Sequence, residues 1–354
     1  MHQRLDRIGA KSSISWYLST IMASAYADKK HFPELMQILT EGIFTPKWSE
    51  DIRRRAVRKL FNERDVGDNY VGTQLQEGFF AAAFSGTPLA TGFRTKESLK
   101  DITLTDLQEF HKKWIVPEVT NLVVVGNIDS DRIGARLKES LDLLPPGDFP
   151  ENPKSPVDLN VPLPNTIELE VKTAGAKDMA YLAVGYRFPS IPELIKSPDM
   201  EFAACMSLVH ILRIGTTSLI QREFFDTGLA VGRPYEVLSW NLGPGFFLFA
   251  LEIPLDRLSE AKTKLKAILA GLPGRDISAE EIAVAAKFSD AAFWIGLERS
   301  HQQATFFASL MRLGVGPDLL ENIAGQFRSL TPEMAKKTAG KYFQNFVLIT
   351  GKSQ

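Results

Sequence analysis

The sequence is poor in the residues that build disulfide frameworks and thiolate metal clusters. Of its 354 residues, one is a cysteine, Cys205, and five are histidines. A single cysteine excludes an intramolecular disulfide and a cluster of thiolate ligands. The cysteine count does not decide the cellular compartment, because a periplasmic protein can also do without disulfides.

Long apolar runs and an excess of charge are also missing. No apolar run approaches the ~20 residues that span a bilayer, and the start, MHQRLDRIGAKSS, lacks the apolar segment of a secretory signal. The formal net charge is -1, so no overall field attracts nucleic acid or an anionic membrane. We expect a soluble chain with no targeting segment in the sequence as given, which leaves the periplasm and the cytoplasm of a bacterium open.

What the chain does contain is an internal repeat. The stretch ESLKDITLTDLQEFHKKWIVPEVTNLVVVGNI predicts an amphipathic helix, a loop and a buried strand from Leu122 to Val125. A similar stretch closes the chain, LENIAGQFRSLTPEMAKKTAGKYFQNFVLITGKS. A second pair of similar stretches begins at Phe32 and Leu258, and both pairs are about 225 to 230 residues apart.

The repeat predicts an α+β fold with two repeated domains, each a mainly antiparallel sheet covered by helices. The first domain is predicted at 1–147 and the second at 166–354. Between them, 148–165 is rich in proline and has no apolar period, so this segment is predicted to be a linker.

The first repeat is shorter than the second at its start. Gly9 corresponds to Gly228, but about eight residues precede Gly9, whereas about 63 separate Asn165 from Gly228. Roughly 55 residues of the first repeat are therefore absent, and we expect its sheet to lack a large piece. Divergence of the two starts is the alternative. The second copy uses this length for predicted strands at Ile167 to Val171 and Ala180 to Tyr186 and for helices at Met200 to Leu212 and Thr217 to Asp226.

Two stretches resemble the pitrilysin/insulinase family of zinc metallopeptidases, which includes the mitochondrial processing peptidase. They are GFRTKESLKDITLTDLQEFHKKWIVPEVTNLVVVGNID and SLIQREFFDTGLAV, and the similarity extends over essentially the whole chain. The resemblance implies a LuxS/peptidase-like fold whose first repeat is truncated at its N-terminal side. It also implies a zinc site on an HxxEH helix, with a third, carboxylate ligand on a later helix.

This sequence departs from the family at the zinc site. No two of its histidines are four residues apart, so the HxxEH motif is absent. In the helix that carries the third ligand, Leu60 takes the ligand position and the cations Arg53 to Arg55 lie nearby. We therefore expect a non-catalytic member without zinc or another cofactor. His111 is interpreted as a surface or half-buried residue, His210 as a core residue, and the arginine run as a solvated helix face.

The resemblance further implies a substrate clamp in the second domain, an arginine and a tyrosine that hold the peptide and stabilise the oxyanion. Aligned on GLAV, Phe224 takes the arginine position and Val231 the tyrosine position, and neither side chain can donate a hydrogen bond. Arg222 is two positions early, about 200° round a helix, and should point away. Arg233 and Tyr235, two apart on one strand, are the candidate peptide contacts. The family's glycine-rich loop is reduced to LRIGTTS.

These observations favour a catalytically silent, metallopeptidase-like subunit. It resembles zinc metalloendopeptidases, is expected to be inactive alone, and would pair as a homo- or heterodimer with a zinc-bearing peptidase subunit around a peptide-binding chamber. Two alternatives stay open, a structural or assembly protein of the same fold and a fragment of an active peptidase whose zinc helix lies upstream of Met1. The apolar stretches GFFAAAFSG and GPGFFLFALEI fit either subunit contacts or core elements.

Overall fold

The computed structural model describes residues 2–17, 20–91, 95–142, 161–239, 244–312, 316 and 319–353, and the chain divides into two compact units. The first unit comprises Met1–Arg64, Arg94–Ser155 and Gly296–Gly314; the second comprises Asp65–Phe93, Pro156–Ile295 and Val315–Gln354. The predicted domains 1–147 and 166–354 follow the sequence repeat and stay a prediction. The predicted linker at 148–165 lies largely outside the described residues.

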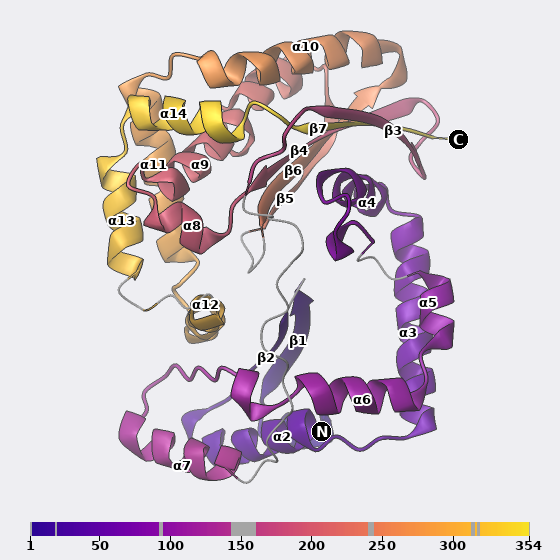
Figure 1. Cartoon of the computed structure of the whole chain (residues 1–354), viewed down its shortest axis with the longest axis vertical. Coiled ribbons are helices and arrows are strands. Elements are labelled where there is room, and N and C mark those ends of the chain that lie inside the picture. The colour runs from indigo at the N-terminus through magenta and orange to yellow at the C-terminus, as the bar shows by residue number, and fades with distance from the viewer. Residues whose placement is uncertain are drawn as a thin grey trace. The chain divides into compact units, whose positions relative to one another are not determined.

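The second unit is built on a five-stranded sheet of order β3-β7-β4-β6-β5 (Figure 1). The strands are β3 Ile167–Thr173, β4 Met179–Phe188, β5 Val231–Ser239, β6 Gly245–Pro254 and β7 Val347–Ser353. β3 and β7 run parallel, and all other neighbours run antiparallel. The predicted α+β fold with a mainly antiparallel sheet is confirmed, and β3 and β4 include both strands predicted before Gly228.

Helices cover both faces of this sheet. The helices of the second unit are α4 Val71–Ala83, α8 Ile191–Lys196, α9 Glu201–Val209, α10 Leu258–Gly271, α11 Ala279–Ile295, α13 Leu319–Ser329 and α14 Pro332–Tyr342. Helix α4 lies on one face, and α9, α10 and α14 lie on the opposite face (Figure 1). Within the described residues, no helix is both long enough and apolar enough to cross a bilayer.

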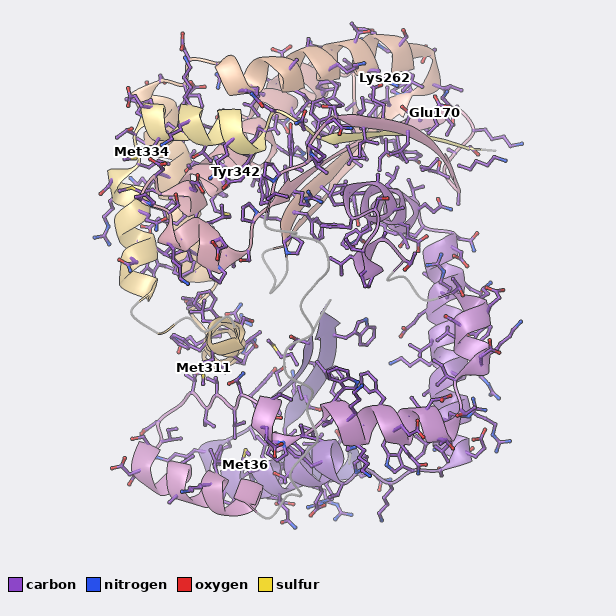
Figure 2. The ribbon with its side chains drawn as sticks, viewed as in Figure 1. Met36, Glu170, Lys262, Met311, Met334 and Tyr342 are labelled. Atoms are coloured by element: carbon purple, nitrogen blue, oxygen red, sulfur yellow. The ribbon has the colours of Figure 1, made fainter. Side chains whose placement is uncertain are left out.

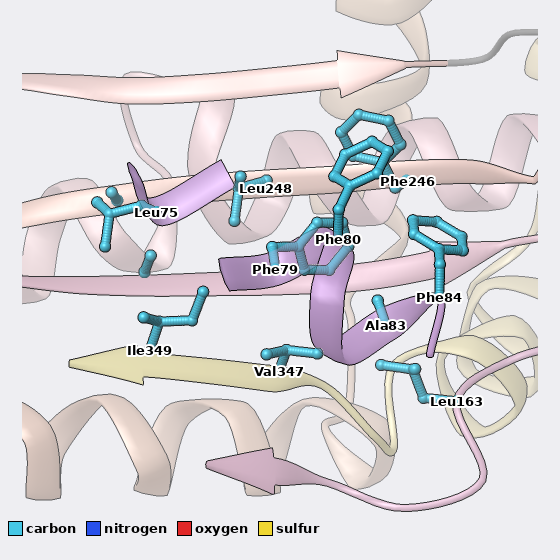
Figure 3. Close-up of a cluster of buried hydrophobic side chains, with 12 residues drawn as sticks. Leu75, Phe79, Phe80, Ala83, Phe84, Leu163, Phe246, Leu248, Val347 and Ile349 are labelled. Carbon is cyan, nitrogen blue, oxygen red and sulfur yellow. The ribbon is translucent and has the colours of Figure 1, made fainter. Parts of the chain in front are cut away.

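The core of the second unit lies between α4 and the sheet (Figure 3). Its side chains come from GFFAAAFSG, which forms the end of α4 and the turn after it, and from the β6 stretch GPGFFLFALEI, so these apolar stretches are core elements. Phe79 is fully buried and lies over Gly185 of β4, where a Cβ atom would come within 2.2 Å of the phenyl ring. The glycine therefore sets how closely α4 approaches the sheet.

The first unit has a much smaller sheet. Its elements are α1 His2–Arg7, β1 Lys11–Tyr17, β2 Thr20–Tyr26, α2 Phe32–Phe44, most of α3 Glu50–Asp68, α5 Lys96–Asp101, α6 Leu104–Trp114, α7 Ser130–Asp142 and α12 Ser300–Arg312. β1 and β2 pair antiparallel as a two-stranded sheet. Leu5, Ile8 and Ala10 pack with Leu35 and Ile38 of α2 into a small separate core.

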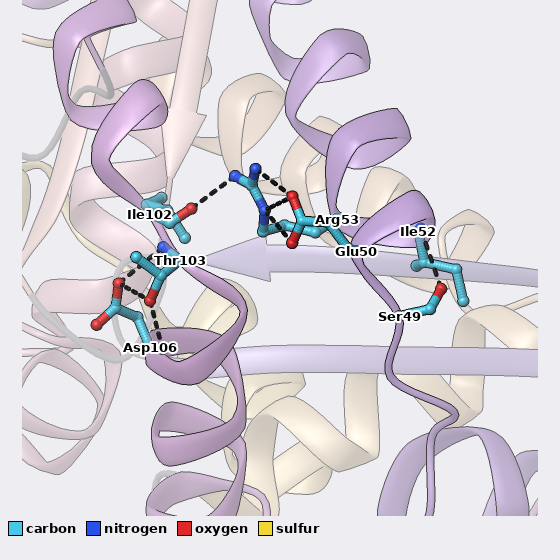
Figure 4. A network of polar contacts seen from close by, with 7 residues as sticks. All are labelled: Ser49, Glu50, Ile52, Arg53, Ile102, Thr103 and Asp106. Atoms are coloured by element: carbon cyan, nitrogen blue, oxygen red, sulfur yellow. Dashed lines mark hydrogen bonds and ion pairs between the residues drawn. The ribbon is translucent and has the colours of Figure 1, made fainter.

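Polar contacts join α3 to the start of α6 in this unit (Figure 4). Thr103 caps α6 in a reciprocal pair of hydrogen bonds with Asp106. Arg53 donates to the Glu50 carboxylate at 2.8 Å and to the carbonyl oxygen of Ile102 at 2.8 Å. Arg53 is half-buried by these contacts, so the interpretation of the whole arginine run as a solvated face was wrong at this position.

The two repeats share one turn in atomic detail. Gly9 and Gly228 both adopt a left-handed conformation, with φ of 61° and 67°. The residue after each glycine donates a backbone hydrogen bond to the carbonyl five positions earlier. The Ala10 N–H donates to the Leu5 carbonyl at 3.0 Å, and the Leu229 N–H donates to the Phe224 carbonyl at 2.8 Å. A strand follows in both cases, β1 and β5. The correspondence between the two glycines is confirmed.

The repeats also exchange a helix. Helix α4 belongs to the first repeat in sequence but to the second compact unit, whereas α12, about 230 residues later, belongs to the second repeat and to the first unit. Helix α12 packs against β2, and His301 stacks on Tyr26 with ring centroids 5.0 Å apart. Each sheet is therefore covered on one face by a helix from the other repeat.

The strand predicted from Leu122 to Val125 is wrong, because these residues are described and form no strand. Its counterpart in the second repeat is β7, which hydrogen-bonds to β3 on one side and to β4 on the other. The described residues of the first unit contain no counterparts of β3 and β4, so the apolar segment has no strand beside it to pair with. Pairing, rather than composition, decides strand formation here.

Candidate functional site

The site lies where a helix of the second unit turns into the edge strand of the larger sheet. A π-helix spans Gln221–Phe225, the chain turns at Gly228, and β5 begins at Val231. π-Helical turns are rare and often occur at functional positions. The Ala230 N–H donates to the Phe224 carbonyl at 2.9 Å, which holds the strand entry against the helix end.

The two clamp positions differ in their surroundings. Phe224 is 0% exposed and forms part of the core. Val231 is 39% exposed and lies opposite Glu252 of β6 in the strand register. The side chain at the arginine position is thus turned into the protein and contributes packing, and the side chain at the tyrosine position offers no hydrogen-bond donor. Arg222 is exposed.

β5 is irregular directly after Val231. Gly232 has φ of 71°, Pro234 follows, and the register shifts between Val231 and Tyr235. Such a bulge bends a strand and re-aims its side chains, so the simple alternation expected for residues two apart does not hold across it. Arg233 lies within β5, but its side chain is outside the described part of the structure.

Tyr235 is a half-buried residue that packs beside α4. Its hydroxyl lies 3.3 Å from Oε1 of Gln76, and its ring meets that of Tyr70 edge-on at 6.3 Å. A Cβ atom on Gly72 would come within 2.7 Å of the Tyr235 ring, so the glycine makes room for the phenol. Burial raises the pKa of Tyr235 to about 12, and the phenol therefore stays protonated and can donate a hydrogen bond at neutral pH.

A buried cation beside the clamp helix is missing from the sequence-based predictions. Arg213 is only 4% exposed; its Nη2 lies 3.6 Å from a Glu236 carboxylate oxygen of β5, and its guanidinium lies over the Phe225 ring. Burial lowers the pKa of Arg213, and Glu236 opposes this shift. The only sequence signal is a lone arginine between apolar residues in HILRIG. Through this pair the reduced loop LRIGTTS is joined to the edge strand.

The donor groups that the structure describes do not fit a zinc site. Among the residues that the structure describes, no three side chains of His, Cys, Asp or Glu come together in a way that could hold a metal ion. A ring nitrogen of His111 lies 2.7 Å from the Ile43 carbonyl oxygen, and His301 stacks on Tyr26. Leu60 is half-buried in α3 and has no ligand atom.

Cys205 and His210 are both buried in the second unit, which makes them poor ligands for a metal ion. Cys205 is fully buried, and burial, with the nearby Glu201, raises the pKa of its thiol well above the usual range. His210 is 8% exposed and packs against Phe288 with ring centroids 4.3 Å apart. His111 is half-buried and His210 lies in the core, so both structural interpretations are confirmed.

Comparison with known proteins finds similarity in sequence and in fold. The family model described as the peptidase M16 inactive domain matches residues 101–287. A curated relative, the probable zinc protease PqqL of Escherichia coli K12, is 24% identical over 188 residues, which cover 52% of this chain and 19% of that protein. The matched part of the chain thus spans about a fifth of that relative's length.

Solved structures extend the likeness to the whole chain. A protease from Helicobacter pylori has a TM-score of 0.83 at 21% identity, over 99% of this chain and 84% of that one. A peptidase M16 inactive domain from Pseudomonas fluorescens has a TM-score of 0.79 at 16% identity, over 100% of this chain and 83% of that one. At these identities the likeness concerns the fold alone.

Proposed function

This chain belongs to the peptidase M16 family, and we propose that it is a catalytically silent subunit that pairs with an active, zinc-bearing peptidase subunit to form a peptide-binding chamber. Its inactive peptidase-like fold agrees with the resemblance predicted from the sequence. The active subunit would supply the zinc and its activated water, and this chain would supply a wall of the chamber.

The observation that carries the proposal is the burial of Phe224. A clamp residue must reach a peptide from the protein surface, and Phe224 is 0% exposed in the core. Replacing a donor at this position by a buried phenyl ring removes the interaction that would stabilise a developing oxyanion. The helix, the turn at Gly228 and the strand that follows are retained, so the part of the fold that shapes a chamber wall is kept without its chemistry.

No cofactor is proposed for this chain. Leu60 offers no ligand atom, and the adjacent Lys59 carries a positive charge that opposes cation binding. Metal analysis of the purified full chain tests this point. We expect zinc well below one equivalent, and stoichiometric zinc would favour a fragment of an active peptidase instead.

Arg233 and Tyr235 are proposed as replacement peptide contacts on the silent side. The protonated phenol of Tyr235 can exchange its long contact with Gln76 for a peptide carbonyl. In the paired enzyme, Tyr235→Phe and Arg233→Ala should each raise KM more than they lower kcat, because they act on binding alone. Arg222→Ala, which removes an exposed cation of the same segment, is the matched control and should leave both constants unchanged.

The pairing itself is tested by mixing. The purified chain is combined with a full-length, HxxEH-bearing relative encoded by a neighbouring gene, and complex formation and peptide cleavage are both measured. We expect a complex, and cleavage that exceeds the sum of the separate proteins. A complex without a change in cleavage would favour the structural or assembly role, and the absence of both would refute the proposal.

A further inference from the structure

Arg213 of the second unit is a buried cation whose hydrogen-bond donors are not all used. It is 4% exposed, its guanidinium lies over the Phe225 ring, and its Nη2 lies 3.6 Å from a Glu236 carboxylate oxygen. This distance is too long for a hydrogen bond. Nε and Nη2 are both buried and have no hydrogen-bond partner among the described residues. Because an arginine stays charged in a protein, two donor nitrogens of a charged group lack an acceptor.

Two other buried charged residues of the same unit are well paired. The Arg187 guanidinium donates to three backbone carbonyl oxygens at 2.7 to 3.1 Å. The Glu201 carboxylate accepts from Nζ of Lys341 at 2.6 Å and from the hydroxyl of Tyr342, which Figure 2 labels on α14, at 2.7 Å. A donor of a buried charge that is left unpaired costs stability. Arg213 differs from both residues, and its two unpaired nitrogens can take an acceptor from outside the chain.

The backbone around Arg213 is held in place by hydrogen bonds. Arg213 belongs to a π-helix, His210–Ile214, and the second π-helix, Gln221–Phe225, follows closely in the chain. Ser218 lies between them and is 2% exposed; its hydroxyl donates to the Arg213 carbonyl at 3.1 Å and accepts from the Gln221 N–H at 3.2 Å. A donor group on a fixed backbone loses little freedom when it binds a ligand. π-Helical turns are also frequent at functional positions.

The two unpaired nitrogens lie on one side of the guanidinium. Nε and Nη2 carry N–H bonds that run nearly parallel, and this planar fork matches the two oxygens of a carboxylate. Glu236 lies beside one arm of the fork but makes no hydrogen bond with it. Its side chain is 41% exposed on the edge strand β5, and the pair with Arg213 is the only ion pair described for it. Since an exposed side chain can rotate into solvent, a carboxylate that accepts from both nitrogens can replace Glu236 at little cost.

We propose that Arg213 binds a carboxylate of a peptide, and that Glu236 occupies the place of this carboxylate while no peptide is bound. The peptide carboxylate accepts hydrogen bonds from Nε and Nη2, the Phe225 ring flanks the guanidinium, and Glu236 turns into solvent. The charge balance of the site is preserved, because one anion replaces another. The inference rests on the proposed peptide-binding role and deepens it by naming the substrate class, which is peptides with an acidic side chain or an accessible C-terminal carboxylate.

The test uses three short fluorescein-labelled peptides of otherwise identical sequence. The first has a central glutamate and an amidated C-terminus, the second a central glutamine and an amidated C-terminus, and the third a central glutamine and a free C-terminus. Fluorescence anisotropy is measured with the full chain and with Arg213→Met, Glu236→Gln and Arg222→Ala. The last variant removes an exposed cation of the same segment and is the matched control. Circular dichroism checks the folding of each variant.

We expect the wild type and Arg222→Ala to bind at least one of the two carboxylate peptides about tenfold more tightly than the amidated glutamine peptide. The preferred peptide identifies the source of the carboxylate, a side chain or a C-terminus. Arg213→Met should bind all three peptides alike. Glu236→Gln removes the internal competitor and should bind the preferred peptide about threefold more tightly than the wild type does.

Equal binding of the three peptides by the wild type, or no binding, would overturn the proposal. Unchanged or weaker binding by Glu236→Gln would assign the pair a purely structural role and would also overturn it. Since Glu236 is exposed, this outcome does not depend on whether Arg213→Met folds. Preference for a carboxylate peptide without cleavage on mixing leaves this inference standing while the proposed function fails, and cleavage on mixing without such a preference gives the reverse.

Discussion

The two repeats share a glycine turn and differ in the sheet around it. Gly9 and Gly228 close the same helix-to-strand turn with equivalent backbone hydrogen bonds. The sheet of the second unit has five strands, of which β3 and β4 precede Gly228 and β5, β6 and β7 follow it, whereas the first unit has two strands among its described residues. The turn depends on a few adjacent residues and is reproduced wherever they occur, while a sheet depends on strands that come from elsewhere in the chain.

The cores differ in the same way. In the second unit, α4 and three inner strands bury a cluster of aromatic and aliphatic side chains. In the first unit, the small core lies beside α2, and the hairpin exposes its apolar residues. Since α4 comes from the first repeat, the better-packed unit depends on a helix that the shorter repeat supplies. This dependence can be tested directly.

The largest effect is expected from Phe79→Ala. Phe79 is fully buried between α4 and β4, and removing its ring should lower the free energy of unfolding by about 3 to 5 kcal/mol. Hydrogen exchange should accelerate in β4 and β6 and stay unchanged in β1 and β2. Phe110→Ala, which truncates an exposed phenylalanine of the first unit, is the control and should have little effect. Faster exchange in β1 and β2 instead would break the assignment of α4 to the second unit.

A smaller loss is expected from Arg187→Met. The Arg187 guanidinium is buried and donates to the carbonyl oxygens of Ala83 at 2.7 Å, Val161 at 2.9 Å and Pro162 at 3.1 Å. Methionine keeps the apolar stem but leaves these acceptors unsatisfied, so we expect a loss of about 2 to 3 kcal/mol, measured by urea unfolding. Arg187→Lys keeps the charge but has fewer hydrogen-bond donors, so its free energy of unfolding should lie between those of the wild type and Arg187→Met. Equal stability of all three proteins would show that the arginine does not fasten α4 to β4.

Sequence patterns predicted the parts of this fold that depend on local signals. The repeat spacing, the glycine turns and the strands of the second repeat all follow from short stretches such as SLIQREFFDTGLAV. The strand predicted from Leu122 to Val125 was wrong, because an apolar, β-branched run forms a strand only where a neighbouring strand offers hydrogen bonds. The exchange of α4 and α12 between the two units could not be predicted either, because the apolar face of an amphipathic helix does not indicate which sheet it packs against.

The candidate site likewise has some features that local sequence predicts and others that depend on contacts between distant residues. The positions of Phe224 and Val231 follow from alignment on one glycine, and apolar residues at such positions are visible in the sequence. The bulge that breaks the alternation between Val231 and Tyr235 is a property of the strand register. The ion pair between buried Arg213 and exposed Glu236 joins residues from a π-helix and a strand, and no local pattern marks that contact.

A loss of about 1 kcal/mol is expected from Gly9→Ala and from Gly228→Ala. Both glycines have positive φ, where a Cβ atom is strained, and neither has a neighbouring atom within 4 Å of that Cβ, so backbone strain is the only term. The matched variants should lose similar free energy, the first in the smaller unit and the second in the larger. Gly271→Ala, a helical glycine with equally open surroundings, is the control and should be neutral or stabilising. Markedly unequal losses at Gly9 and Gly228 would show that the turns are less equivalent than their hydrogen bonds indicate.

The smallest effect is a pH dependence that belongs to the second unit alone. Burial lowers the pKa of His210, so its imidazole binds a proton less readily in the folded protein than in the unfolded chain, where a histidine binds a proton as the pH falls below about 6.5. The unfolded state then holds more protons, and the stability contributed by the neutral ring is complete above this pH and decreases below it. His210→Gln should remove this component and flatten the stability profile between about pH 7 and 5 relative to the wild type. Urea unfolding at several pH values, followed by hydrogen exchange in α9 and α11, measures the difference. Parallel profiles for the two proteins would mean that His210 is solvated in the folded state, and that the packing of this histidine on Phe288 is looser than the distance of 4.3 Å between their ring centroids indicates.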